Sequence, residues 1–257
     1  MNEKKIVFFD IDGTLLNSDK VISDSTKEAI DALRQNDVHV AIATGRGTSL
    51  YKDIRQELAI DCYVSFNGAH CVYDGEVIYK RALERQYLEQ LTDFAHSLDC
   101  PVGYINTEEM KISRESQYAV ESIASIRRPA PKVDPDFYQK NDIYQAFLFC
   151  TEELDGLFPE AVPAFDYIRW HKLSVDVVRK GGSKADAIVA LADKLGYKNE
   201  NVYAFGDGSN DVEMLREVGV GVAMGNATDF VKSHADYVTK HIDEDGIYYG
   251  LKHLKLI

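Results

Sequence analysis

Short, wholly hydrophobic runs that end abruptly in polar clusters recur along the chain. Runs of this length without alternation are typical of strands that are buried on both faces of a parallel sheet. Each polar cluster would then be a loop at the carboxyl end of a strand. The runs, with the first residue of the cluster that follows each, are 6–9 before Asp10, 38–43 before Thr44 and 202–205 before Gly206. Further short strands are predicted at 220–223 and 237–238.

Amphipathic helical patterns separate these runs. Ser25 and Glu28 have the spacing of a capping box, and the helix that they would start closes at Asn36. Ser183 is predicted to cap a second helix, which carries its apolar residues on one face and ends just before Gly196. Strands that alternate with helices predict an α/β fold with a doubly wound, mostly parallel, Rossmann-like core sheet.

The pattern changes between residues 83 and 181. Residues 87–98 are predicted to be helical, an irregular polar stretch follows, and alternating strand patterns return at 146–149 and 173–177. We interpret 83–181 as a smaller α+β domain inserted into the first one. The predicted domains are therefore a core made of residues 1–82 and 182–257, and an inserted domain made of residues 83–181.

Composition limits the partners that the chain is expected to have. A net charge of −13 makes nucleic acid an unfavourable partner, because binding its backbone needs a basic surface. We expect no membrane association, because no apolar run reaches the ~18 residues of a membrane span. The short apolar run before Asp10 does not predict a signal peptide, and the four cysteines form no CxxC pair. A cytoplasmic location fits these observations; the oligomeric state cannot be read from the sequence.

Four aspartates lie in the clusters that follow the predicted strands: Asp10, Asp12, Asp207 and Asp211. Ligands of open α/β sheets bind outside the carboxyl ends of the strands, so these clusters are expected to converge on one site. Several carboxylates together require a cation, and hard oxygen ligands favour Mg²⁺.

Spacing and residue type suggest roles within this site. Residues i and i+2 of an extended segment face the same side, so Asp10 and Asp12 could address one reacting centre. One carboxylate can accept a phosphoryl group while a second acts as general acid and then as base. Lys184, in the first turn of the helix that Ser183 caps, offers a cation to phosphate oxygens.

Four motifs in order make the chain resemble the Cof-type phosphatases of the haloacid dehalogenase superfamily. The match extends over nearly the whole chain, and a turn at Asn67-Gly68-Ala69 is also similar to this branch. The resemblance implies a Mg²⁺-dependent hydrolase of small phosphate monoesters, such as sugar phosphates or phosphorylated cofactors. It also implies that residues 83–181 are a substrate-selecting cap. The motifs are Asp10-Ile-Asp-Gly-Thr, Thr44-Gly-Arg, Lys184 within Lys180-Gly-Gly-Ser-Lys-Ala, and Gly206-Asp-Gly-Ser-Asn-Asp.

The resemblance further implies a role for each motif residue. Asp10 would be the nucleophile and a metal ligand, and Asp12 the general acid and base, with its main-chain carbonyl on Mg²⁺. Asp207 would be a second metal ligand, and Asp211 would support the metal site. The groups that would hold the phosphoryl are Thr44, Gly45, Lys184, Asn210 and the main chain at Ile11.

Two other functions are compatible with these motifs. A phosphomutase of the same superfamily uses the same two aspartates, Asp10 and Asp12, but needs a bisphosphate activator and releases little free phosphate. A phospho-ligand sensor without activity would keep the binding site alone. The intact catalytic positions favour the phosphatase.

Overall fold

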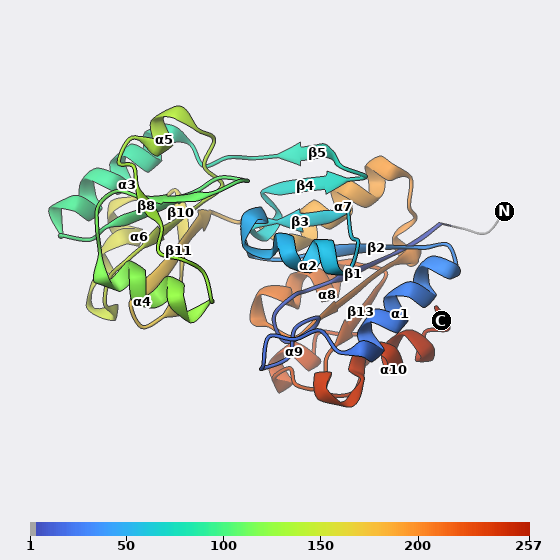
Figure 1. Cartoon of the computed structure of the whole chain (residues 1–257). Helices are drawn as coiled ribbons and strands as arrows, with labels where there is room; N and C mark the ends of the chain where they lie inside the picture. Colours follow the sequence, from blue (N-terminus) through green and yellow to red (C-terminus); the bar gives the residue numbers. More distant parts are fainter. Residues whose placement is uncertain (1–3) are drawn as a thin grey trace. The chain divides into compact units, whose positions relative to one another are not determined.

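A computed structural model describes residues 4–257, and the chain divides into two compact units. The first unit comprises the described residues up to Gly45, together with Asp53–Lys80 and Ser183–Ile257. The second comprises Arg46–Lys52 and Arg81–Gly182. In the colours of Figure 1 the first unit contains the blue, cyan and orange-to-red segments of the described residues, whereas the second is mainly green and yellow.

The first unit is built on an eight-stranded sheet of order β14-β13-β12-β1-β2-β3-β4-β5. Neighbouring strands from β14 to β3 are parallel, and β4 and β5 are added to the β3 edge as antiparallel strands. The predicted doubly wound, mostly parallel sheet is confirmed. The strands are β1 Lys5–Phe9, β2 Val38–Ala43, β3 Tyr63–Ser65, β4 His70–Tyr73, β5 Glu76–Lys80, β12 Val202–Gly206, β13 Val220–Ala223 and β14 Tyr237–Val238.

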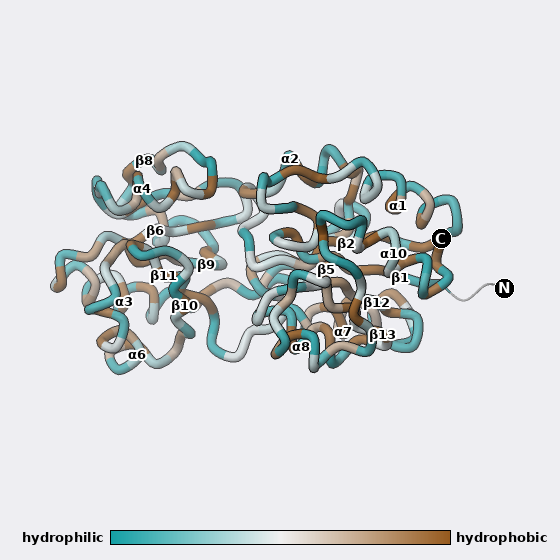
Figure 2. Tube along the Cα trace, turned by 90° about the horizontal axis from the view of Figure 1, so that it is seen from below, coloured by the Kyte–Doolittle hydropathy of each residue, from teal (hydrophilic) through white to brown (hydrophobic). Residues whose placement is uncertain are grey.

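Strand β1 lies between β12 and β2, in the interior of this sheet. Its four apolar residues are completely buried, as expected for a strand covered on both faces. Ile6 and Phe8 belong to a core cluster with Ile188 and Leu191 of helix α7, Lys184–Leu195. The alternation of hydrophobic strands with hydrophilic loops can be followed along the tube in Figure 2.

Helix ends in the first unit follow the polar residues of the sequence closely. Ser183 caps α7 and Gly196 follows it in the left-handed region, as predicted. The predicted end at Asn36 of helix α1, Asp24–Gln35, is also confirmed, but its predicted start is wrong. Ser23, not Ser25, accepts a hydrogen bond from the first turn; the Ser25 hydroxyl instead donates to Asp245.

Helix α1 is as long as α7, and the other helical segments of the first unit are shorter. They are α2 Lys52–Glu57, α8 Val212–Glu217, α9 Asp229–Lys232 and α10 Gly246–His253, with single 3₁₀ turns at Phe66–Gly68, Asn199–Asn201, Ser209–Asp211 and Ile242–Glu244.

The second unit has its own six-stranded sheet, of order β10-β11-β9-β6-β7-β8, and its own hydrophobic cluster. All neighbouring strands are antiparallel except β7 and β8. Its strands are β6 Val102–Ile105, β7 Met110–Ile112, β8 Lys132–Val133, β9 Gln145–Leu148, β10 Phe165–His171 and β11 Ser174–Arg179. Its helical segments are α3 Arg85–Ser97, α4 Gln117–Ser125, α5 Phe137–Lys140 and α6 Leu157–Ala161, with 3₁₀ turns at Thr48–Tyr51 and Glu152–Leu154.

Within residues 4–257, the helices are too short or too polar for any of them to cross a bilayer.

Candidate active site

The candidate site forms at the carboxyl ends of the adjacent strands β1 and β12. Asp10 is the first residue after β1, and Asp207 is the first residue after β12. The backbone N–H of Asp10 donates to the carbonyl of Phe205 over 3.0 Å, which fixes one strand end against the other. The chain leaves β1 for β2 on one side and later returns to β12 on the other. This is the switch point at which open α/β sheets bind their ligands.

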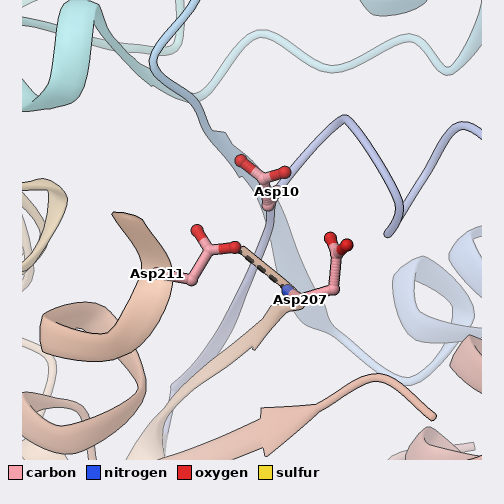
Figure 3. A group of neighbouring side chains, drawn as sticks. All are labelled: Asp10, Asp207 and Asp211. Carbon is pink, nitrogen blue, oxygen red and sulfur yellow. Dashed lines mark hydrogen bonds between the residues drawn. The ribbon is translucent and has the colours of Figure 1, made fainter. Parts of the chain in front are cut away.

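Three carboxylates converge at this switch point. Asp10, Asp207 and Asp211 each contribute an oxygen, and these oxygens all lie within 4.8 Å of one another (Figure 3). Asp10 is 6% exposed, Asp211 is fully buried and Asp207 is partly buried. The predicted convergence of the polar clusters is therefore found for these three residues.

Lys184 brings a buried cation to the same place. Its Nζ donates to Oδ1 of Asp10 over 2.5 Å and to Oδ1 of Asp211 over 2.7 Å, and the residue is 1% exposed. The N-cap at Ser183 positions this first residue of α7. The turn after β3 lies against the same cap, since a Cβ on Gly68 would come within 2.2 Å of the Ser183 carbonyl oxygen.

Asp211 organises the loop that follows β12. Its Oδ2 accepts hydrogen bonds from the backbone N–H groups of Asp207, at 3.0 Å, and of Gly208, at 2.9 Å. Together with the Lys184 contact, these bonds engage both oxygens of the carboxylate, which is why the carboxylate can be fully buried. Asp211 thus connects the loop carrying Asp207 to the lysine.

The charges of this cluster do not balance. Burial raises the pKa of Asp10 to about 8, Asp211 adds to the rise, and Lys184 opposes it. Burial and Asp211 together raise the pKa of Asp207 to about 6. Burial would lower the pKa of Lys184, but Asp10 and Asp211 outweigh it and the net shift is upward. One ammonium facing three carboxylates leaves an excess of negative charge that a bound cation would relieve.

Two side chains that sequence reasoning missed hold Asp207. Thr14 Oγ1 donates to Oδ1 of Asp207 over 3.0 Å, and Asn226 Nδ2 donates to Oδ2 over 3.2 Å and to the Gly13 carbonyl over 2.8 Å. Gly13 leaves the space that the carboxylate needs, because a Cβ there would lie 2.1 Å from Oδ2. Thr14 belongs to the first motif, whereas Asn226 could have been noticed only as a polar residue shortly after strand β13.

Asp12 lies outside the cluster of three carboxylates. Its side chain is 44% exposed and forms an ion pair with Lys20, whose Nζ is 2.7 Å from Oδ1. The carboxylates of Asp12 and Asp10 are close enough for Asp12 to raise the pKa of Asp10, although it is the smallest of the contributions. The structure therefore separates a buried aspartate from an accessible one only two residues later.

The remaining predicted residues lie at the ends of the same strands. Thr44 follows β2 and is 2% exposed, and its carbonyl accepts from the Asn67 N–H over 3.2 Å. Gly45 lies against the Asn67 side chain, with a Cβ position only 2.9 Å from its Oδ1. Ile11 is fully buried beside Asp10, whereas Asn210 is exposed. The part of the chain from Asp10 to Asn210 thus brings all four motifs to the carboxyl ends of β1, β2 and β12.

Comparisons with known proteins agree with this geometry. The model of the family of haloacid dehalogenase-like hydrolases matches residues 7–251. A Bacillus subtilis (strain 168) protein named "Putative phosphatase YkrA" is 41% identical over 256 residues, which cover 99% of each chain.

Two solved structures extend the comparison. A hypothetical protein from Geobacillus kaustophilus HTA426 is 48% identical, with a TM-score of 0.96 over 99% of this chain and 100% of the other. The sugar phosphatase BT4131, of subclass IIB of the same superfamily, is 33% identical, with a TM-score of 0.85 over 99% and 100% of the two chains.

Proposed function

The chain belongs to the haloacid dehalogenase-like hydrolases and acts on phosphate esters, and we propose that it transfers the phosphoryl group of a small metabolite to Asp10 and then to water. The observation that carries this proposal is the buried triad of Asp10, Lys184 and Asp211 beside Asp207. A buried, oriented carboxylate next to a fixed ammonium suits nucleophilic attack on an anionic phosphoryl group.

Asp10 is the proposed nucleophile because of its environment. Burial, and after it the Asp211 carboxylate, raise its pKa to about 8 and so disfavour the ionised form. Lys184, at 2.5 Å, favours the ionised form and would at the same time neutralise a phosphoryl oxygen. Nucleophile and electrostatic stabiliser are thus in place before a substrate arrives.

Mg²⁺ is the proposed cofactor. The carboxylates of Asp10 and Asp207 and the main-chain carbonyl of Asp12 would hold it, and Asp211 would support the site through Lys184 and the loop after β12. Oxygen donors and an excess of negative charge suit a small, hard divalent cation. When bound, Mg²⁺ supplies charge neutralisation at the transferring phosphoryl group.

Asp12 is the proposed general acid and base. Its accessible carboxylate, paired with Lys20, can exchange protons with a leaving group and with water, which the buried Asp10 cannot do as easily. The main chain at Ile11 and the residues Thr44, Gly45 and Asn210 would hold the phosphoryl oxygens along with Lys184. Their placement at the strand ends supports this assignment.

We assign residues 83–181 to a cap domain that selects the leaving group, and residues 1–82 and 182–257 to the catalytic core. The similarity to a sugar phosphatase supports sugar phosphates as substrates, with phosphorylated cofactors as the second class. The four cysteines are free thiols, which agrees with the cytoplasmic location that we propose. Exchanging residues 83–181 for the matching segment of BT4131 should change the preferred substrate. Retention of the original preference by that chimera would refute this assignment.

A phosphate-release screen tests the function as a whole. The purified chain should hydrolyse members of a panel of sugar phosphates and phosphorylated cofactors with Mg²⁺, and should lose this activity with a chelator. The Asp10→Asn variant should be inactive on every substrate of the panel. Isomerisation that depends on a bisphosphate, with little phosphate release, would instead identify a mutase, and binding without turnover would identify a sensor.

A further inference from the structure

Cys100 and Cys150 lie opposite one another across two antiparallel segments of the second unit. The register of β6 and β9, continued outward, places Pro101 opposite Phe149 and then Cys100 opposite Cys150. The Phe149 N–H donates to the Pro101 carbonyl over 3.0 Å, so the next pair outward is of the non-hydrogen-bonded kind. Residues in such a pair have Cα atoms about 4.5 Å apart, within the range of about 4.4–6.8 Å that a disulfide spans.

The two thiols already interact. Both side chains belong to the hydrophobic cluster of the second unit, and each residue is 2% exposed. The Cys100 thiol donates to the carbonyl of Pro101 over 3.7 Å, and each of the two cysteines shifts the pKa of the other. Neither sulfur needs a change of strand register to reach the other.

Arg169 makes the two thiols chemically different. Its Nη2 lies 3.8 Å from Sγ of Cys150, and its Nη1 donates to the Cys150 carbonyl over 3.1 Å. The neighbouring Cys100 side chain, and then Arg169, lower the pKa of Cys150 in spite of burial. The neighbouring Cys150 side chain and burial raise the pKa of Cys100. Cys150 is therefore the thiol of the pair that ionises more readily, and Cys100 is the thiol that lies opposite it.

The other two cysteines provide an internal comparison. In the register of β3 and β4, Cys71 pairs with Val64, so Cys62 is displaced from it by two residues. Such diagonal neighbours are about 7–8 Å apart, beyond the usual reach of a disulfide. Burial raises the pKa of both Cys62 and Cys71 to about 12, which leaves them as unreactive thiols.

We propose that Cys100 and Cys150 are a redox-active pair that a hydroperoxide converts into a cross-strand disulfide. The Cys150 thiolate attacks the peroxide, an S–O bond forms, the O–O bond breaks, and the alkoxide or hydroxide takes up a proton. The Cys100 sulfur then attacks the Cys150 sulfenic acid, the S–S bond forms, and the S–O bond breaks with loss of water. Two thiols are oxidised, and one peroxide is reduced to an alcohol (or water) and water.

Hydrogen peroxide is the probe for this proposal, because burial admits only a small oxidant. The reduced full chain is treated with it in native buffer, denatured, alkylated and digested without reductant, and the peptides are identified by mass spectrometry. We expect a Cys100–Cys150 linked peptide that reductant separates, with Cys62 and Cys71 alkylated. The count of free thiols should fall from four to two.

Cysteine variants test the role of each thiol even if the wild-type protein is oxidised slowly. In Cys100→Ser, a 1,3-dione reagent should trap Cys150 as its sulfenic acid. In Cys150→Ser, Cys100 should stay alkylatable, while Cys62→Ser should form the disulfide at the wild-type rate. The proposal is overturned if all four thiols persist, if Cys62 and Cys71 become linked as fast, or if Cys150 proceeds to sulfinic acid while Cys100 stays reduced.

Discussion

Lys184 donates a 2.7 Å hydrogen bond to Asp211, and both side chains are fully buried. A buried ion pair is costly to break from one side, because the charge that remains has no partner. Lys184, at the start of helix α7, is therefore already paired with Asp211 in the folded chain. This pairing fixes the place where its ammonium contacts Asp10. The charge of Lys184 and its position on α7 both contribute to activity, and mutation can test these contributions.

Lys184→Met should lower kcat by about 10²–10³, the usual effect of removing one electrostatic stabiliser of a transition state. Asp10 and Asp211 would then face each other without a cation, so thermal stability should fall as well. Lys194→Met removes the same charge from an exposed position on α7, where Nζ donates to the Ile78 carbonyl over 3.2 Å, and should leave kcat unchanged. Equal kcat values for the two variants, measured at saturating Mg²⁺, would contradict the assigned role.

Metal affinity should depend differently on Asp207 and Asp211. Asp211→Asn disturbs the support of the site and should weaken Mg²⁺ binding by about 10–100-fold, the usual cost of losing an outer-sphere partner. Asp207→Ala removes a proposed ligand and should weaken binding more than that, or abolish it. Calorimetric titration with Mg²⁺ measures both effects, with the exposed Asp243→Asn as the control. An Asp207→Ala variant that bound Mg²⁺ normally would exclude Asp207 as a ligand.

The stability of the metal-free protein should depend on pH through Asp207. Its pKa rises from 3.8 to about 6 on folding, so the folded chain binds more protons there than the unfolded chain between these pH values. Stability from this residue should therefore fall as pH rises from about 4 to about 6 and stay constant above that. The difference between wild type and Asp207→Asn in thermal unfolding with chelator isolates this contribution. Mg²⁺ should stabilise the wild type increasingly as pH rises through the same range.

Asp10 and Asp12 should act at different steps of the reaction. Asp12→Ala should lower turnover by about 10²–10⁴, the range of general acid–base catalysis. With an activated aryl phosphate, whose leaving group needs no proton, the second step should suffer more than the first. Phosphoaspartate should then accumulate on Asp10, and rapid quench with peptide mass spectrometry would detect it. Label on a histidine or serine, or normal turnover, would rule out the two-carboxylate mechanism.

Asn226 should matter although it lies outside every motif. Its amide holds Asp207 and the Gly13 carbonyl, and its Oδ1 accepts from the Ile242 N–H over 3.1 Å. Asn226→Ala should cost about 1–3 kcal/mol of stability, because it leaves partly buried groups unpaired. Asn226→Asp keeps the shape but sets a second carboxylate beside Asp207. It should therefore lower the stability of the metal-free protein more than the stability of the protein with Mg²⁺. Urea unfolding with and without Mg²⁺ separates these two effects.

The sequence predicted those parts of the molecule that local pattern determines. The apolar run of β1, the cap at Ser183 and the glycine at 196 each act within a few residues, and all are found where they were predicted. The start of α1 was misplaced because Ser23 and Ser25 are chemically equal candidates, and the contact with Asp245 that occupies Ser25 comes from far along the chain.

Long-range partners account for what sequence reasoning missed in the site. Asn226 is 19 residues from Asp207, and its role depends on the loop after β13 reaching the end of β12. The ion pair of Asp12 depends on a turn that brings Lys20 back to it. Neither relationship leaves a periodic signal, so only the folded chain reveals it.

The position of β1 between β2 and β12 also determines when the candidate site can assemble during translation. Strand β2 is available soon after β1 leaves the ribosome, but β12 begins at Val202 and its loop ends at Asp211. The main segment of the second unit, Arg81–Gly182, is complete before then. Just over four-fifths of the 257-residue polypeptide must therefore be translated before Asp10 can meet Asp207, so a nascent or truncated chain that ends earlier has its first motif but no assembled cluster of three carboxylates.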